Sequence, residues 1–133
     1  MYDDLRELNH KIQRKQEHID ELRSALTSLS APIGVVVQSS HSDRMAALTC
    51  KVIMEERKLD KLIDKYADRK REVLDEIFSL KNEEMQEILC LHYVEYKSLS
   101  EISEITGLSI DCVKKKNGKA LKKLLTAQAN FGR

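Results

Sequence analysis

Residues 98–124, SLSEISEITGLSIDCVKKKNGKALKKL, decide how the rest of the chain is interpreted. Ser98 and Glu101 form the pattern S-x-x-E, a capping box that starts a helix. Gly107 follows as the turn residue, because glycine adopts a positive φ without strain. Ser109 suits the N-cap of a second helix. The stretch therefore predicts a helix-turn-helix, in which two helices meet at a glycine turn.

Small and β-branched residues occur at the offsets that two closely packed helices need. Ser103, four residues before Gly107, is small enough to let the helices approach each other. Val113, six residues after Gly107, is expected to face back onto the first helix. Ile102 and Ile105 are the expected inward positions of the first helix.

The second helix of this unit is strongly basic. In such motifs the N-terminal half of the second helix reaches base edges in the major groove. We expect Ile110, Asp111, Lys114 and Lys115 to lie there, while later lysines contact phosphates. The predicted DNA-contacting residues are Ser109, Ile110, Asp111, Lys114, Lys115, Lys116, Lys119, Lys122 and Lys123. The alternatives are a solvated lysine face and a helix-turn-helix that contacts only proteins.

Gly118 interrupts this helix and costs about 1 kcal/mol relative to alanine. Close approach of another backbone is one explanation for its presence.

The distribution of charge supports a nucleic-acid partner, although the whole chain has a net charge of only +1. Residues 110–133 carry seven basic side chains and one acidic side chain. Residues 55–91 carry eleven acidic and eight basic side chains. A chain that is nearly neutral overall therefore concentrates positive charge at its C-terminal end.

Composition predicts an all-α fold, because the chain has one Pro and four Gly among 133 residues, 34% of which are charged. No apolar run approaches the length of a membrane span, so we expect a cytoplasmic protein without a membrane partner. Three cysteines without a CxxC spacing argue against disulfides and structural zinc. Neither Cys90-x-His92 nor the cluster from Ser39 to Asp43 makes a metal or catalytic site by spacing alone. We therefore expect no metal, no cofactor, no catalytic residues and no enzyme.

Two heptad patterns precede the helix-turn-helix. The first helix is predicted over residues 2–29 and the second over residues 42–80, with Ser42 or Ser40 as its N-cap. The apolar seam residues are Leu5, Leu8, Ile12, Ile19, Leu22, Leu26 and Leu29, then Met45, Leu48, Val52, Leu59, Leu62, Tyr66, Val73, Ile77 and Leu80. The charged breaks in these seams are Lys15, Glu55 and Arg69. The pattern predicts a long antiparallel coiled-coil hairpin, but the same seams also suit pairing between two copies of the chain.

The connecting segments complete the predicted architecture. Residues 30–41 contain Pro32, Gly34 and the triplet Val35–Val37, which we expect to close the hairpin rather than form a strand. A third helix is predicted over residues 83–94, with Asn82 as its N-cap. The prediction is thus a hairpin domain over residues 1–81 and a helix-turn-helix domain over residues 82–133.

The sequence LHYVEYKSLSEISEITGLSIDCVKKKNGKALKKL, within residues 83–125, resembles region 4 of the sigma-70 family of RNA polymerase sigma factors. In that family this region reads the −35 promoter element. The resemblance implies double-stranded DNA as ligand and makes RNA polymerase a candidate partner. Tyr96 departs from the family, whose turn usually has Gly there. Asp111 places at the start of the recognition helix a carboxylate that repels phosphate but can accept from a cytosine amino group.

The order of two long helices, a junction at Val37–Ser40 and a sigma-like module resembles small phage and integrated-element proteins of Gram-positive bacteria. Those proteins are described as sigma-70 region 4-like or as late transcriptional regulators. Without a counterpart of sigma region 2, the chain is not expected to be a complete sigma factor. We expect a phage-type or mobile-element DNA-binding transcriptional regulator that forms a homodimer through the coiled coil. The alternatives are an interaction module that docks on RNA polymerase or another phage protein, and a small-terminase-like DNA-packaging protein.

Overall fold

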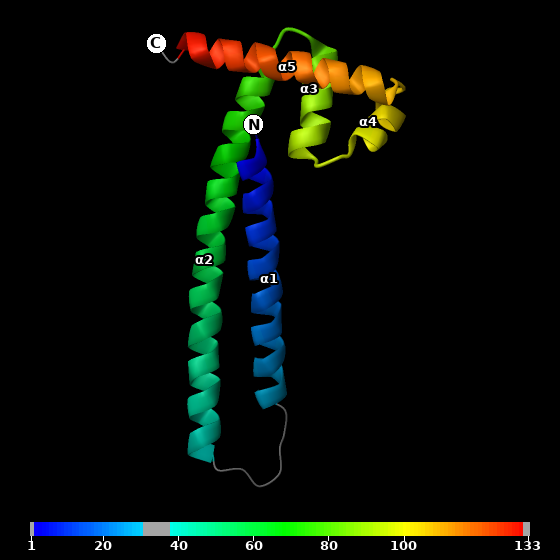
Figure 1. The fold of residues 1–133 in the computed structure, drawn as a ribbon. Coiled ribbons are helices and arrows are strands. Elements are labelled where there is room, and N and C mark those ends of the chain that lie inside the picture. The colour runs from blue at the N-terminus through cyan, green and yellow to red at the C-terminus, as the bar shows by residue number, and fades with distance from the viewer. Residues whose placement is uncertain (1, 31–37, 132–133) are drawn as a thin grey trace. The chain divides into compact units, whose positions relative to one another are not determined.

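The regular structure of this protein is helical throughout the part of the chain that the computed structural model describes, residues 2–30 and 38–131 (Figure 1). The elements are α1 (Asp3–Ser30), α2 (Gln38–Phe78), α3 (Glu83–Leu89), the π-helical turn η1 (Cys90–Val94), α4 (Leu99–Thr106) and α5 (Ile110–Phe131). The predicted all-α fold, with long helices followed by a short helical module, is confirmed. Within these residues, no helix combines the length and apolar character needed to cross a bilayer.

The helix boundaries differ from the prediction at the start of α2. This helix begins at Gln38, so the prediction of Ser42 or Ser40 as its N-cap is wrong, because both residues lie inside the helix. The segment from Gln38 to His41 contains no Pro or Gly, and nothing in its backbone chemistry prevents the helix from starting early. The triplet Val35–Val37 lies outside the described residues, so its expected role in closing the hairpin stays a prediction.

Internal contacts divide the chain into two compact units. One consists of Met1–Glu7 with Tyr66–Arg133, and the other is Leu8–Lys65, here called the arm. Both long helices contribute residues to each unit. The division into domains at residues 81 and 82 stays a prediction.

Within the arm, α1 and the first part of α2 run antiparallel, side by side (Figure 1). The seam contains the buried residues Ile19, Val52 and Leu59. The other predicted seam positions in the arm are half-buried: Leu8, Ile12, Leu22, Leu26, Leu29, Met45, Leu48 and Leu62. The two heptad seams therefore pair within one chain, and the predicted hairpin is confirmed.

Two of the predicted charged breaks in the heptads pair with each other across this seam. Lys15 Nζ of α1 donates to Glu55 Oε2 of α2 at 2.7 Å, and Glu55 is only 9% exposed. Lys58, one turn further along α2, donates to the other Glu55 oxygen at 3.3 Å. The hydrogen bond from Lys15 holds the pKa of the Glu55 carboxyl below its ordinary value. A polar pair in an apolar seam favours this one register, because a slip would leave both charges facing apolar side chains.

We predict that Lys15→Met and Glu55→Leu each lower the urea midpoint by more than the double substitution does. Each single change leaves one charge of the pair in the seam, whereas the double change continues the apolar seam. The matched control is the exposed pair Asp68 and Arg71, whose atoms lie 3.8 Å apart and whose substitutions should be additive. Additive effects at Lys15 and Glu55 would contradict the prediction.

The same pair also makes the stability of the arm depend on pH. Because the pKa of Glu55 is lowered in the folded state, its stabilisation is present above the pKa of an unfolded glutamate, about 4.3. That stabilisation is lost as the pH falls through the folded-state value. Chemical denaturation at a series of acidic pH values should therefore show that the free energy of unfolding of the parent approaches that of Glu55→Gln as the pH falls.

Candidate nucleic-acid interface

One buried stripe positions α5. Val113, Ala120 and Leu124 are 0%, 0% and 2% exposed, and their spacing of seven and four residues places them on one face of the helix. Val113 packs with Ile88 of α3 and Ile102 of α4. The opposite face of α5 is consequently directed to solvent.

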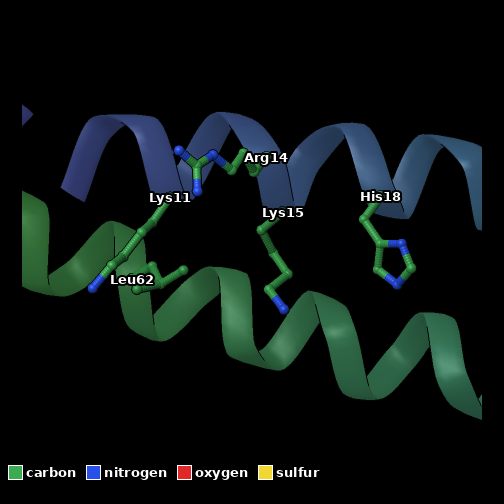
Figure 2. A pocket seen from close by; sticks show the side chains of 5 residues that line it. All are labelled: Lys11, Arg14, Lys15, His18 and Leu62. Atoms are coloured by element: carbon green, nitrogen blue, oxygen red, sulfur yellow. The ribbon is translucent and has the colours of Figure 1, made fainter. Parts of the chain in front are cut away.

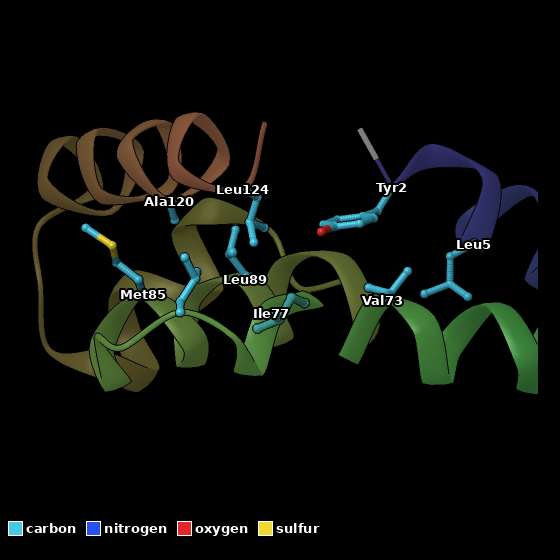
Figure 3. Packing of buried hydrophobic residues seen from close by; sticks show 9 residues of the cluster. Tyr2, Leu5, Val73, Ile77, Met85, Leu89, Ala120 and Leu124 are labelled. Carbon is cyan, nitrogen blue, oxygen red and sulfur yellow. The ribbon is translucent and has the colours of Figure 1, made fainter. Parts of the chain in front are cut away.

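A second apolar cluster holds the C-terminal part of the stripe (Figure 3). Ala120 and Leu124 belong to it together with residues from α3, from the end of α2 and from the start of the chain. The other members are Tyr2, Leu5, Val73, Ile77, Leu80, Met85 and Leu89. Leu5 and Val73, which the heptad pattern predicts in the hairpin seam, also share this core with α5.

Hydrogen bonds to α2 hold the first residues of the chain against this core. The Tyr2 hydroxyl donates to Glu76 Oε2 at 2.8 Å, and Arg69 Nε donates to Asp4 Oδ2 at 2.6 Å. Arg69 also lies over the Tyr2 ring, 5.9 Å from its centroid. Arg69, the third predicted break in the heptads, thus fixes the first turn of α1 instead of filling the seam.

The predicted caps and turn of the helix-turn-helix are present. Ser98 Oγ accepts from the Glu101 amide at 3.2 Å, and Ser109 Oγ accepts from the Cys112 amide at 3.2 Å. Asn82 Oδ1 caps α3 by accepting from the Met85 amide at 3.1 Å. Gly107 ends α4 with φ of 77°, the left-handed conformation that the sequence predicted for it.

Most of the predicted DNA-contacting residues lie on the solvent side of α5 or at its start. Those exposed are Ser109, Ile110, Asp111, Lys114, Lys115, Lys119, Lys122 and Lys123. We call Lys114, Lys115, Lys119, Lys122 and Lys123 the lysine face. No ion pair involving these five is found among the described residues. Their contact with DNA stays a prediction.

Lys116 differs from the lysine face. It is half-buried, and its ammonium group donates to Glu84 Oε1 of α3. This hydrogen bond raises the pKa of Lys116 above its ordinary value, so the residue stays charged while it faces the protein. The two residues are 32 positions apart in sequence, so nothing in the local sequence pattern distinguished Lys116 from the other lysines.

Ile105 is 54% exposed, so the prediction that it faces inward is wrong. The helix α4 is only eight residues long and ends at Thr106, so it presents one buried position, Ile102, to its neighbours. Ile110, on the other side of the turn in sequence, is 42% exposed. Two isoleucines near the turn are thus available for apolar contacts such as those with thymine methyl groups.

Tyr96 adopts φ of 60°, which is uncommon for a residue with a side chain. It occupies the position at which the resemblance places glycine. Its hydroxyl lies 3.0 Å from the Tyr66 hydroxyl and donates to the Leu5 carbonyl oxygen at 3.4 Å. Burial and the Tyr66 hydrogen bond raise the pKa of Tyr96, so it stays a neutral phenol. The contacts of the phenol offset the cost of the left-handed backbone.

Residues 79–125 match the family model of sigma-70, region 4. This segment, which contains α3, η1, α4 and most of α5, is a sigma-70 region 4-like helix-turn-helix. The region 4 family is one of DNA-binding domains without catalytic activity. No curated protein and no solved structure gives a significant match to the chain.

The Cys90-x-His92 pair lies in η1 within this segment. Burial, followed by the nearby charge of Glu95, raises the pKa of the Cys90 thiol. His92 Nδ1 lies 2.9 Å from the Lys97 carbonyl oxygen, to which it donates. Among residues 2–30 and 38–131, no three His, Cys, Asp or Glu side chains gather where they could hold a metal ion.

We predict that Gly118→Ala stabilises the protein by about 0.5–1 kcal/mol, because alanine is the better helix former. A Cβ added at Gly118 meets no described group within 4 Å, so the suggested close approach of a backbone is not observed. The matched control is Gly107→Ala, which also has open space but requires φ of 77° and should be destabilising. Thermal unfolding followed by circular dichroism measures both, and a lower melting temperature for Gly118→Ala would contradict the prediction.

Proposed function

We propose that this protein is a transcriptional regulator that binds duplex DNA through the lysine face of α5. The observation that supports the proposal is the separation of α5 into two faces within a region 4-like helix-turn-helix. One face is buried in the core at Val113, Ala120 and Leu124, while the other presents five exposed lysines without ion-pair partners among the described residues. A helix held rigidly by one face can present the other to a DNA groove.

The residues of α5 take different roles in this proposal. Ile110, Asp111, Lys114 and Lys115 lie in the first two turns and contact base edges, where Asp111 accepts from a cytosine amino group. Lys119, Lys122 and Lys123 contact phosphates. Lys116 keeps its pair with Glu84 and holds α5 against α3.

The setting and partners of the regulator also belong to the proposal. We place it in a phage or mobile element, in the cytoplasm, with RNA polymerase as a candidate partner. The heptad seams of the arm are occupied within one chain, so a homodimer would form through another face of the arm. Ile53 and Met54 of α2 are neighbouring exposed apolar residues that suit such a contact.

We predict that the double substitution Lys114→Gln and Lys115→Gln weakens binding to a duplex selected from a random-sequence pool by about tenfold or more. The matched control is Lys116→Gln, which removes one positive charge from the same helix but should lower thermal stability more than DNA affinity. Fluorescence anisotropy of labelled duplex measures the affinity. For the parent, the three lysines that contact phosphates predict that α5 contributes about −2.7 to the slope of log K against log salt.

Three outcomes of these measurements distinguish the candidate functions. Affinity that is insensitive to salt and to the Lys114 and Lys115 substitutions would overturn the proposal. Retention of RNA polymerase on the immobilised protein without any DNA binding would support the docking alternative. A ring-shaped assembly measured by light scattering would support a DNA-packaging protein.

A further inference from the structure

A groove lined by basic side chains runs along the arm, far in sequence from α5. Its lining residues are Lys11, Arg14, Lys15 and His18 of α1 and Leu62 of α2, and its volume is about 340 Å³ (Figure 2). Lys11, Lys15 and His18 extend from α1 toward α2, and Leu62 lies between the two helices in this view. We call this site the basic groove.

The positive charge of the basic groove is only partly neutralised by the protein. Residues 9–16 carry three basic side chains and no acidic one. Lys15 pairs with Glu55 at 2.7 Å, but no described carboxylate forms an ion pair with Lys11 or Arg14. Helical hairpins commonly place acidic residues opposite the basic residues that flank their seam. Lys11 and Arg14 lack this compensation, so they remain available for an anion from outside the chain.

The lining chemistry selects the kind of anion. Leu62 and the methylene stems of the basic side chains supply the apolar part of the lining, which is too small to cover the apolar face of an amphipathic acidic helix. The only ring in the lining is the His18 imidazole, which offers a free nucleotide base less stacking surface than Phe, Tyr or Trp. Flexible lysine and arginine side chains along an open groove suit a row of phosphates, which require positive charge without fixed geometry.

We propose that the basic groove binds the phosphate backbone of duplex DNA outside the base pairs that α5 reads. This inference rests on the proposed function, because it assigns a second contact to the same DNA ligand. Contacts with phosphates would add affinity and salt dependence without adding sequence preference.

The test uses the full chain with the double substitution Lys11→Gln and Arg14→Gln, which spares Lys15 and its seam partner Glu55. The matched control is Arg57→Gln with Lys61→Gln, because both residues are exposed on α2 of the same arm, do not line the basic groove and give an equal change in net charge. Circular dichroism melts verify that both variants remain folded. Affinity is measured across a range of salt concentrations on a long duplex that carries the selected site at one end.

The groove variant should make the slope of log K against log salt shallower by about 2, since two phosphate contacts are lost. Its preference for the selected site over a scrambled site should equal that of the parent. Hydroxyl-radical footprinting should show protection beyond the selected site that the groove variant loses and the control variant keeps.

A groove variant with the slope and footprint of the control would overturn this inference, while sensitivity to Lys114→Gln and Lys115→Gln would leave the proposed function standing. A groove variant that loses an acidic protein partner, with DNA binding unchanged, would also overturn it. No DNA binding by the parent would overturn both proposals at once.

Discussion

The burial of one stripe of α5 is the constraint on which the functional surface depends. A helix can expose a regular row of lysines only when its other side is fixed, and here Val113 and Leu124 fix it at two points along its length. The two points belong to different clusters. Val113 is held by α3 and α4, whereas Leu124 shares a cluster with residues of α2 and with Tyr2 at the start of the chain. The direction of the lysine face is therefore set by segments at both ends of the sequence.

The charged residues that interrupt the heptads have a corresponding role in the long helices. An apolar seam alone tolerates slips by whole heptads, because any such register buries similar area. Lys15 and Glu55 remove that ambiguity, since each meets a partner in only one alignment. Arg69 leaves the seam to bind Asp4 and to cover the Tyr2 ring, and this fixes the position at which α1 begins. The three breaks thus specify the pairing of the helices more sharply than the apolar positions between them.

Periodicity and capping patterns were sufficient to predict the helices, the hairpin and the turn, because these depend on local chemistry. Ser98, Gly107 and Ser109 act within a few residues of themselves, and the structure confirms each. The prediction that Ile105 faces inward failed, because an apolar side chain does not indicate where a short helix ends its contact with the neighbouring helix. Lys116 could not be separated from the other lysines, since its orientation depends on Glu84, 32 residues away in sequence. Tyr96 was visible only as a departure from the glycine expected there; its contacts with Tyr66 and Leu5 join residues distant in sequence.

The near-neutral composition can be reconciled with two positive surfaces by considering which charges are paired. Glu84 and Glu55 pair with the half-buried residues Lys116 and Lys15, and Glu56 pairs with the exposed Arg23. In these ion pairs the acidic side chains neutralise basic residues that orient the helices. The lysine face of α5, and Lys11 and Arg14 of the arm, are among the cations that have no ion-pair partner in the described residues. The net charge of the chain therefore does not reflect its local positive surfaces. Several carboxylates form ion pairs that stabilise the helices, while unpaired lysines remain available to a polyanion.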